Sequence, residues 1–221
     1  MNLCRHALVW IRPEQRAVVA ARVSDSELYA QVAAWLAADR PLVVARQPSK
    51  NTLSDMIAVG LALTPAQGRR RIALSVSEHD IVRCTPPLLL GDALTHAPVR
   101  WRPALTELDA AARDIDIELR VFGSLAWQAL SGLPYLTPQS DIDLLWHAHS
   151  HTRLQQGIAL LARWEQESGL RADGEVLFGE GSAVSWREWA RLESGSDRRV
   201  LVKRVGSAEL VEAADLQGLL A

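Results

Sequence analysis

Cysteine is scarce in this sequence: Cys4 and Cys84 are the only two among 221 residues. Two cysteines so far apart form neither the closely spaced pairs of a zinc motif nor the framework of a disulfide-rich domain. Structural disulfides are also rare in the reducing cytoplasm. The scarcity of cysteine therefore excludes a disulfide scaffold and a cysteine-rich metal module, and it favours a cytoplasmic location.

Long apolar runs are missing as well. The first sixteen residues, MNLCRHALVWIRPEQR, contain a short apolar segment that charged residues interrupt. This segment lacks the apolar core of a secretory signal. The chain also has no run near the roughly 20 apolar residues that a transmembrane helix needs. We therefore expect a soluble protein with no membrane partner.

An excess of one charge is absent too, because the formal net charge at pH 7 is −2. Such a chain has no general attraction for nucleic acid or for a membrane surface. Positive charge gathers only locally, at Arg69–Arg71 and in a second basic cluster of Arg198, Arg199, Lys203 and Arg204. Most of it is arginine, whose planar guanidinium suits phosphate and carboxylate groups. We expect local contacts with anions and no nucleic-acid partner.

Residues 1–84 are predicted to form a small N-terminal α+β module. A capping sequence, Ser24-x-x-Glu27, opens a predicted helix over 24–40, in which apolar residues recur at helical spacing. Pro41 ends this helix. Strands are expected at 7–11, 41–47, 54–65 and 69–77, and the turn TPAQG joins the last two.

The Pro-rich stretch 85–101 is predicted to connect this module to a larger domain over 102–221. Helical and strand patterns alternate in the larger domain, which indicates an α/β (α+β) fold with a mixed sheet and flanking helices. Helices are expected at 102–115, 125–132, 150–169 and 183–194. A strand followed by a turn is expected at 117–124, and strands are expected at 140–148, 172–179 and 198–206, the last of the chain.

Two aspartates interrupt the apolar strand SDIDLLW. Residues two apart on a strand share a face, so Asp141 and Asp143 point together while Ile142, Leu144 and Trp146 point into the core. Two adjacent carboxylates repel each other unless a cation lies between them. Mg²⁺ takes few protein carboxylates and completes its shell with water and substrate phosphates. The pair therefore predicts a magnesium site for phosphate chemistry.

The Gly123-Ser124 pair lies where a strand gives way to a helix. The free backbone N–H groups and the dipole of a helix N-terminus can hold an anion. Glycine lets the backbone approach a phosphate closely, and serine adds a hydroxyl donor. Strand, Gly-Ser, helix and a second strand with D-x-D together predict phosphoryl or nucleotidyl transfer.

These residues resemble two families, one nested within the other. GS, a helix and SDIDLLW resemble the nucleotidyltransferase superfamily that includes DNA polymerase beta. More narrowly, FGSLAWQALSGLPYLTPQSDIDLLW, DGEVLFGEGSAVSWREWA and VLVKR resemble malonate decarboxylase holo-acyl-carrier-protein synthase, also called phosphoribosyl-dephospho-CoA transferase. The resemblance covers roughly 115–205, and the start HALVWI fits less specifically. The gap between Ser124 and Asp141 is longer than is usual in the superfamily, and its segment GLPYLTPQ agrees with the narrower family.

The narrower resemblance implies a reaction. A phosphoribosyl-dephospho-CoA group passes from 2'-(5''-triphosphoribosyl)-3'-dephospho-CoA to a serine of the apo acyl-carrier subunit of malonate decarboxylase, with release of diphosphate. Asp141 and Asp143 would hold Mg²⁺ against the triphosphate, and Gly123 and Ser124 would bind the leaving diphosphate. Positioning and electrostatics would then do most of the catalysis.

The superfamily commonly uses a third carboxylate from a neighbouring strand, often as a base. Asp173 and Glu175 are the candidates, two residues apart on one face, and Asp173 is preferred. Lys203 is a candidate for binding substrate phosphate, with a solvated edge strand as the alternative. The sequence HAHSH invites a zinc site at His147, His149 and His151, but a change of chain direction there favours a helix cap or a substrate contact instead.

Two other functions remain open at this point. One is a different nucleotidyltransferase that adenylylates a protein or a small molecule. The other is a catalytically inactive nucleotide-binding module, against which the intact Gly-Ser and D-x-D argue. The N-terminal module is expected to help bind the carrier protein or the CoA moiety.

Overall fold

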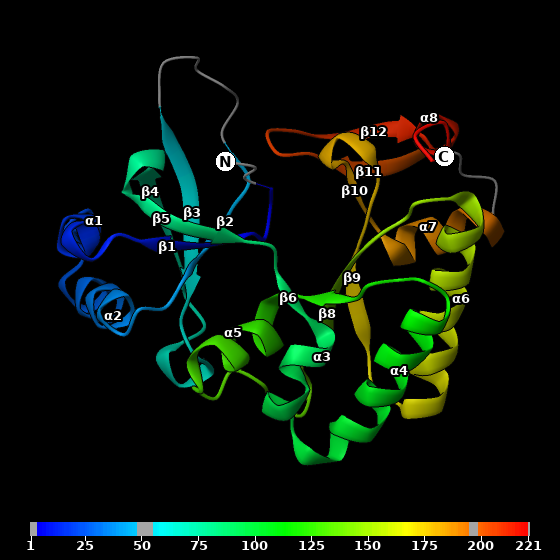
Figure 1. The fold of residues 1–221 in the computed structure, drawn as a ribbon, viewed down its shortest axis with the longest axis horizontal. Helices are drawn as coiled ribbons and strands as arrows, with labels where there is room; N and C mark the ends of the chain where they lie inside the picture. The colour runs from blue at the N-terminus through cyan, green and yellow to red at the C-terminus, as the bar shows by residue number, and fades with distance from the viewer. Residues whose placement is uncertain (1–3, 48–54, 195–198, 221) are drawn as a thin grey trace. The chain divides into compact units, whose positions relative to one another are not determined.

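A computed structural model of the protein describes residues 4–47, 55–194 and 199–220. They form two compact units, which divide between Pro87 and Leu88 (Figure 1). Arg198 of the second basic cluster lies outside the described residues. Within the described part of the chain, no helix has both the length and the apolar character needed to cross a membrane.

The first unit contains an antiparallel sheet of five strands in the order β4-β3-β2-β1-β5. The strands β3 and β4 form the hairpin predicted around TPAQG, and the residues buried in each alternate with less buried ones. The elements are β1 (Leu8–Ile11), η1 (Pro13–Gln15), α1 (Arg16–Ala20), α2 (Ser26–Ala37), β2 (Leu42–Val44), β3 (Met56–Ala62), η2 (Pro65–Gln67), β4 (Arg71–Ser77), η3 (Glu78–Asp80) and β5 (Ile81–Thr85).

The N-terminal cap of α2 differs from the sequence prediction. Asp25, not Ser24, caps the helix, because its carboxylate accepts hydrogen bonds from the amides of Glu27 and Leu28, each at 3.0 Å. The predicted capping box is therefore wrong by one residue. An ionised carboxylate binds helix amides more strongly than a hydroxyl does, which favours the aspartate. Helix α1 and strand β5 were not predicted.

The boundary between the units falls inside the stretch 85–101, which the sequence predicts as a connection. Residues 88–101 instead hold β6 (Leu88–Leu89), α3 (Leu90–Ala93), η4 (Leu94–His96) and η5 (Val99–Trp101). Trp101 is 3% exposed and belongs to the hydrophobic core of the second unit. Residues 88–101 are folded into that unit, because Leu90, Ala93 and Ala97 are buried in its core as well, and this corrects the prediction of a connection.

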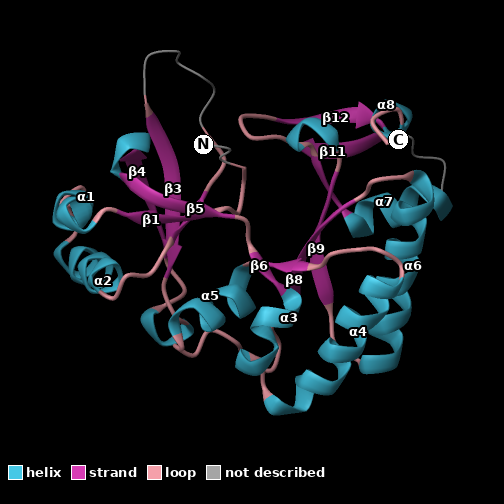
Figure 2. Ribbon diagram, in the orientation of Figure 1, coloured by secondary structure: helices cyan, strands magenta, loops and turns pink. Residues whose placement is uncertain are grey.

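The second unit contains a mixed sheet of seven strands in the order β12-β11-β10-β9-β8-β7-β6 (Figure 2). The pair β8–β9 is parallel, and the other pairs are antiparallel. The α/β fold class is confirmed. The remaining elements are α4 (Arg102–Asp114), β7 (Arg120–Val121), α5 (Gly123–Ser131), β8 (Ile142–His147), α6 (His151–Ser168), β9 (Ala172–Leu177), η6 (Gly179–Gly181), β10 (Ala183–Ser185), α7 (Trp186–Ser194), β11 (Arg199–Lys203), β12 (Ala208–Glu212) and α8 (Ala213–Gln217).

Two predicted elements near the C-terminus differ from the structure. The predicted helix 183–194 begins as strand β10 and becomes α7 only at Trp186. A short apolar stretch does not distinguish a strand from a helix by periodicity, and here pairing with β9 decides. The strand expected at 198–206 is β11, and it is not the last one, because β12 pairs with it and α8 follows.

Strand β8 is buried on one face, as predicted. Ile142, Leu144 and Trp146 are at most 1% exposed and belong to the core of the second unit. Gly157 lets α6 approach Trp146 closely, because a Cβ atom at position 157 would lie 2.5 Å from the indole ring. Side chains alternate along a strand, so Asp143 projects from the opposite face.

Candidate active site

Gly123 and Asp143 meet at the start of α5. The backbone of Phe122 donates a hydrogen bond of 3.1 Å to the carbonyl oxygen of Asp143, which continues the pairing of β7 with β8. Gly123 follows with a φ of +63°, and a Cβ atom there would lie 1.8 Å from Oδ2 of Asp143. Only glycine leaves room for this contact, so the Gly-Ser turn and the D-x-D strand form one site.

The N-terminus of α5 lies at this site. Phe122 occupies the cap position and makes no side-chain cap hydrogen bond, and Gly123 and Ser124 are the first two helical residues. The first amides of a helix have no acceptor within the helix. Ser124 is half-buried beside them. These amides lie beside the carboxylate of Asp143, where a phosphate bridged to that carboxylate by a cation could bind.

Asp143 also faces a carboxylate on the neighbouring strand. Strands β8 and β9 run parallel, and their register places Asp143 directly opposite Asp173. Residues paired in this way project from the same face of the sheet. Asp141 lies one residue before β8, and its Oδ1 is 3.4 Å from Nε of Arg171. Three carboxylates from two adjacent segments therefore gather at one end of this sheet face.

The structure distinguishes the two candidates for the third carboxylate. Asp173 is exposed, and its Oδ1 accepts a hydrogen bond of 2.8 Å from the amide of Gly174. Glu175 is only 5% exposed, and its Oε1 lies 2.8 Å from Nζ of Lys203. The arrangement favours Asp173 as a group that can meet a ligand, while Glu175 serves to hold Lys203.

Lys203 lies on the same sheet face as the aspartates. It is paired with Ala183 on β10, which is paired with Leu177 on β9, and Leu177 is paired with His147 on β8. Its amine donates a hydrogen bond to Glu175. Glu175 is paired with Leu145 on β8, two residues after Asp143. The predicted phosphate-binding lysine is thus part of this face but is joined to Glu175 rather than to an aspartate.

Sequence reasoning did not identify Arg120 as a site residue. Arg120 is paired with Leu145 and therefore projects from the face that carries Asp143. Its guanidinium lies 2.5 Å from Oε1 of Glu118. The signal in the sequence was the alternation of Arg120 with the buried Leu119 and Val121 in the segment ELRVFG. This arginine adds a positive charge to the sheet face that carries Asp143.

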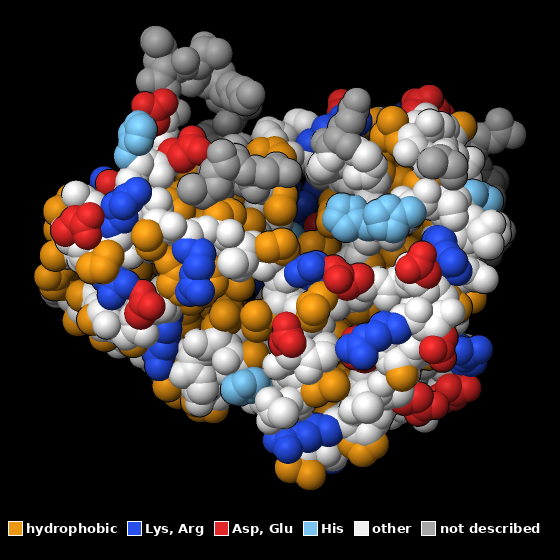
Figure 3. All heavy atoms as spheres, viewed as in Figure 1, with side chains coloured by type: hydrophobic (Ala, Val, Ile, Leu, Met, Phe, Trp, Pro, Cys, Tyr) orange, Lys and Arg blue, Asp and Glu red, His pale blue; other side chains and the backbone are white. Residues whose placement is uncertain are grey.

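The histidines near the end of β8 do not form a metal cluster. His147 and His149 stack with ring centroids 5.7 Å apart, and neighbouring histidine side chains are visible on the surface in Figure 3. Partial burial, His149 and Arg120 together lower the pKa of His147. Ser150 caps α6 by accepting a hydrogen bond from the amide of Arg153. Among the described residues, no group of three or more His, Cys, Asp or Glu side chains is placed so that it could hold a metal ion.

Comparison with known protein families decides the assignment. A model of the phosphoribosyl-dephospho-CoA transferase MdcG C-terminal domain matches residues 88–214, and a model of the corresponding N-terminal domain matches residues 4–87. The chain belongs to the phosphoribosyl-dephospho-CoA transferase family. The two matched ranges also meet where the structure divides into two units.

Curated relatives agree with this assignment along most of the chain. A phosphoribosyl-dephospho-CoA transferase of Xanthomonas campestris pv. campestris (strain 8004) is 42% identical over 94% of this chain and 93% of its own length. A protein of the same name from Bradyrhizobium diazoefficiens is 34% identical over 94% of this chain and 89% of its own. No solved structure matches the chain. The resemblance seen in the sequence is confirmed at the level of the family, and the protein is a transferase.

Proposed function

We propose that the protein transfers a phosphoribosyl-dephospho-CoA group from 2'-(5''-triphosphoribosyl)-3'-dephospho-CoA to a serine of the apo acyl-carrier subunit of malonate decarboxylase, with release of diphosphate. Membership of the transferase family supports the transferred group. The observation that carries the chemistry is the contact between the Gly123 backbone and the Asp143 carboxylate. It brings an anion-binding helix end and a cation-binding carboxylate to one point.

Mg²⁺ is the proposed cofactor, and the donor set suits it. Asp141 and Asp143 would hold the ion, because carboxylate oxygens are the ligands it prefers. The ion would take its other ligands from water and substrate phosphates. When bound, Mg²⁺ supplies neutralisation of the charge on the triphosphate.

The other site residues would act on the substrate directly. The helix-end amides at Gly123 and Ser124 would bind the diphosphate that leaves, and the Ser124 hydroxyl would add a donor. Lys203 would add positive charge on the same sheet face, held in place by Glu175. Asp173 is the proposed base for the attacking serine hydroxyl, because it is exposed and lies directly opposite Asp143.

A second candidate is a nucleotidyltransferase that adenylylates a protein or small molecule. The same carboxylates and helix end would serve that reaction, so the geometry alone does not separate the two. Membership of the phosphoribosyl-dephospho-CoA transferase family favours the first, and it counts against an inactive nucleotide-binding module. A cytoplasmic location remains a prediction from the sequence.

Mass spectrometry of the apo carrier subunit tests the proposal. The carrier is incubated with this enzyme, Mg²⁺ and the triphosphoribosyl-dephospho-CoA donor, and in a parallel reaction with ATP in place of the donor. We expect a mass gain of one phosphoribosyl-dephospho-CoA group with the donor and none with ATP. A gain with ATP alone would overturn the proposal in favour of adenylylation.

Variants of the aspartates test the site. Asp141→Asn and Asp143→Asn should each abolish the mass gain while leaving the melting temperature nearly unchanged. Asp116→Asn is a matched control, because Asp116 is an exposed aspartate of the same unit with a φ of +57°, which asparagine tolerates. Near-normal transfer by either site variant would refute the metal assignment.

A further inference from the structure

The outer edge of β9 at Ala172 is bound by side chains instead of by a strand. Strand β10 pairs with β9 at Glu175, Val176 and Leu177, and then the chain turns into α7 at Trp186. At Ala172 the backbone amide donates a hydrogen bond of 2.6 Å to Oε1 of Glu165. Its carbonyl oxygen accepts one of 2.8 Å from Arg187 and one of 3.3 Å from the indole of Trp186.

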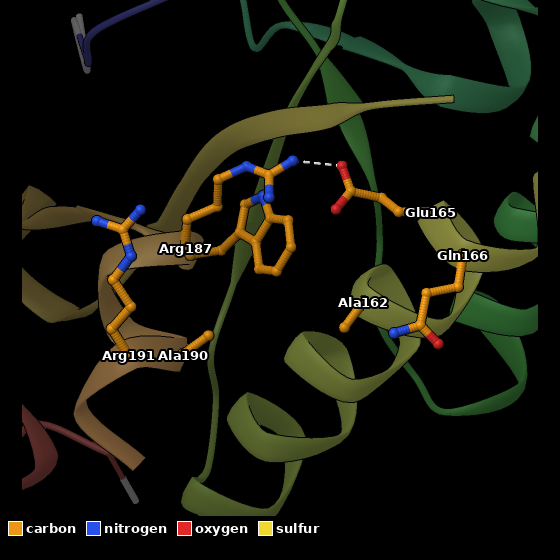
Figure 4. A pocket seen from close by; sticks show the side chains of 7 residues that line it. Ala162, Glu165, Gln166, Arg187, Ala190 and Arg191 are labelled. Atoms are coloured by element: carbon orange, nitrogen blue, oxygen red, sulfur yellow. Dashed lines mark hydrogen bonds and ion pairs between the residues drawn. The ribbon is translucent and has the colours of Figure 1, made fainter. Parts of the chain in front are cut away.

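Glu165 and Arg187 are also bound to each other. Figure 4 shows their ion pair, which joins α6 to α7 beside a pocket of about 430 Å³. The Arg187 guanidinium stacks on Trp186, 4.6 Å from the ring centroid. The side chains of Glu165 and Arg187 are 17% and 32% exposed, respectively. Their hydrogen bonds to Ala172 are therefore poorly accessible to competing water. We call Glu165 and Arg187 together the Ala172 clamp.

On its other side, β9 is hydrogen-bonded to β8 next to Ala172. The amide of Ile142 donates a hydrogen bond of 2.8 Å to the carbonyl oxygen of Arg171, and Ile142 is the register partner of Ala172. Ala172 is therefore fixed from both sides, by β8 on one and by the clamp on the other. The next residue is Asp173, directly opposite Asp143.

We propose that Glu165 and Arg187 are positioning residues that hold Asp173 at its place opposite Asp143. This inference rests on the proposed function, in which Asp173 acts on the attacking serine. The clamp acts by restraining the backbone of Ala172, the residue that precedes Asp173. Hydrogen bonds between charged side chains and backbone groups are stronger than neutral ones, which suits a restraint of this kind.

Loss of the clamp should lower turnover more than binding. A displacement of one ångström at a reacting group can cost about 100-fold in rate. We expect Arg187→Met to lower kcat by about 10- to 100-fold, while the KM for the donor stays nearly unchanged. Glu165→Gln keeps an oxygen for the Ala172 amide and should have a smaller effect. If Arg187→Met folds poorly, Glu165→Gln replaces it as the variant that tests the clamp.

A double-mutant cycle separates positioning from general structural damage. If Arg187 acts through Asp173, then Arg187→Met should cause no further loss of kcat in an Asp173→Asn enzyme. Arg191→Met is the matched control, because Arg191 lies one turn further along α7 and lines the same pocket. It should leave kcat unchanged in both backgrounds.

Hydrogen–deuterium exchange gives a readout that does not depend on transfer activity. The peptide that covers 172–177 should exchange faster in Arg187→Met and Glu165→Gln than in the wild type, and should be unchanged in Arg191→Met. Losses of kcat that multiply in the double variant, or unchanged exchange in both clamp variants, would overturn the positioning role. A wild-type enzyme that transfers nothing from the donor contradicts the proposed function instead, and exchange still tests the clamp.

Discussion

Replacement of Gly123 by alanine should disable the enzyme while leaving it folded. The new Cβ atom would lie 1.8 Å from Oδ2 of Asp143, whereas real Cβ atoms keep at least about 3.0 Å from other heavy atoms. The carboxylate therefore has to retreat by about 1.2 Å. A shift of this size at a catalytic group costs about 100-fold in rate. We expect a loss of kcat of that order in the carrier-modification assay.

The cost in stability should be much smaller. Gly123 has a φ of +63°, and the left-handed conformation costs an alanine about 1–2 kcal/mol. In a protein of this size, such a loss lowers Tm by roughly 2–8 °C. Thermal unfolding by circular dichroism should therefore show a cooperative transition at a moderately lower temperature.

Gly132→Ala is the control that isolates the clash. Gly132 ends the same helix, α5, with a φ of +71°, and a Cβ atom there meets nothing within 4 Å. Both variants pay the same conformational cost, but only Gly123→Ala displaces a carboxylate. Gly132→Ala should lose stability and keep its activity. If the two variants have similar kcat values, the contact between Gly123 and Asp143 does not matter for catalysis.

Three further predictions follow from the second unit. Gly174→Ala should prevent normal folding, because its Cβ atom would lie 1.9 Å from the backbone oxygen of Leu144, and a low yield of folded protein would show this. Burial raises the pKa of Asp109 although Arg113 opposes the shift. The folded state therefore binds the Asp109 proton more tightly than the unfolded state does. The free energy of unfolding of the wild type should fall as pH rises from about 4 through the folded-state pKa, whereas that of Asp109→Asn should not show this fall. By NMR, His147 should titrate below the usual value of about 6.5, and His149→Gln should raise its pKa.

Each of these has an outcome that contradicts it. Gly179→Ala is the control for Gly174, because the nearest atom to its Cβ would lie at an ordinary 3.7 Å, so equal yields of the two variants would oppose the packing argument. A stability difference at Asp109 that does not vary with pH would contradict the raised pKa. A His147 midpoint at or above the usual value would contradict the lowered pKa.

The sequence predicted much of the site because its local patterns are strong. Alternation in SDIDLLW separated the aspartates from Ile142, Leu144 and Trp146, and the structure confirms that these three are buried. The Gly-Ser pair was correctly predicted at the junction of a strand and a helix. The role expected for glycine was close approach to a phosphate, whereas the structure shows close approach to the Asp143 carboxylate.

Features that depend on pairing between distant segments were missed or left open. Asp173 and Glu175 have the same spacing pattern, and only the register of β8 with β9 and the bond between Glu175 and Lys203 distinguish them. The strand β10 was predicted as part of a helix, because a segment of three residues carries no usable periodicity. The short helices in 88–101 were hidden by prolines that suggested a linker.

The sequence by itself determined the chemical character of this protein, namely two carboxylates on one strand, a Gly-Ser pair at a helix start and membership of a transferase family. These follow from residue type and short spacing, which do not change on folding. The tertiary structure alone decided which groups meet: Gly123 with Asp143, Asp173 opposite Asp143, and the Ala172 clamp behind them. The reason is that strand register and helix packing bring together residues that lie tens of positions apart in the sequence. A local sequence pattern does not predict such contacts.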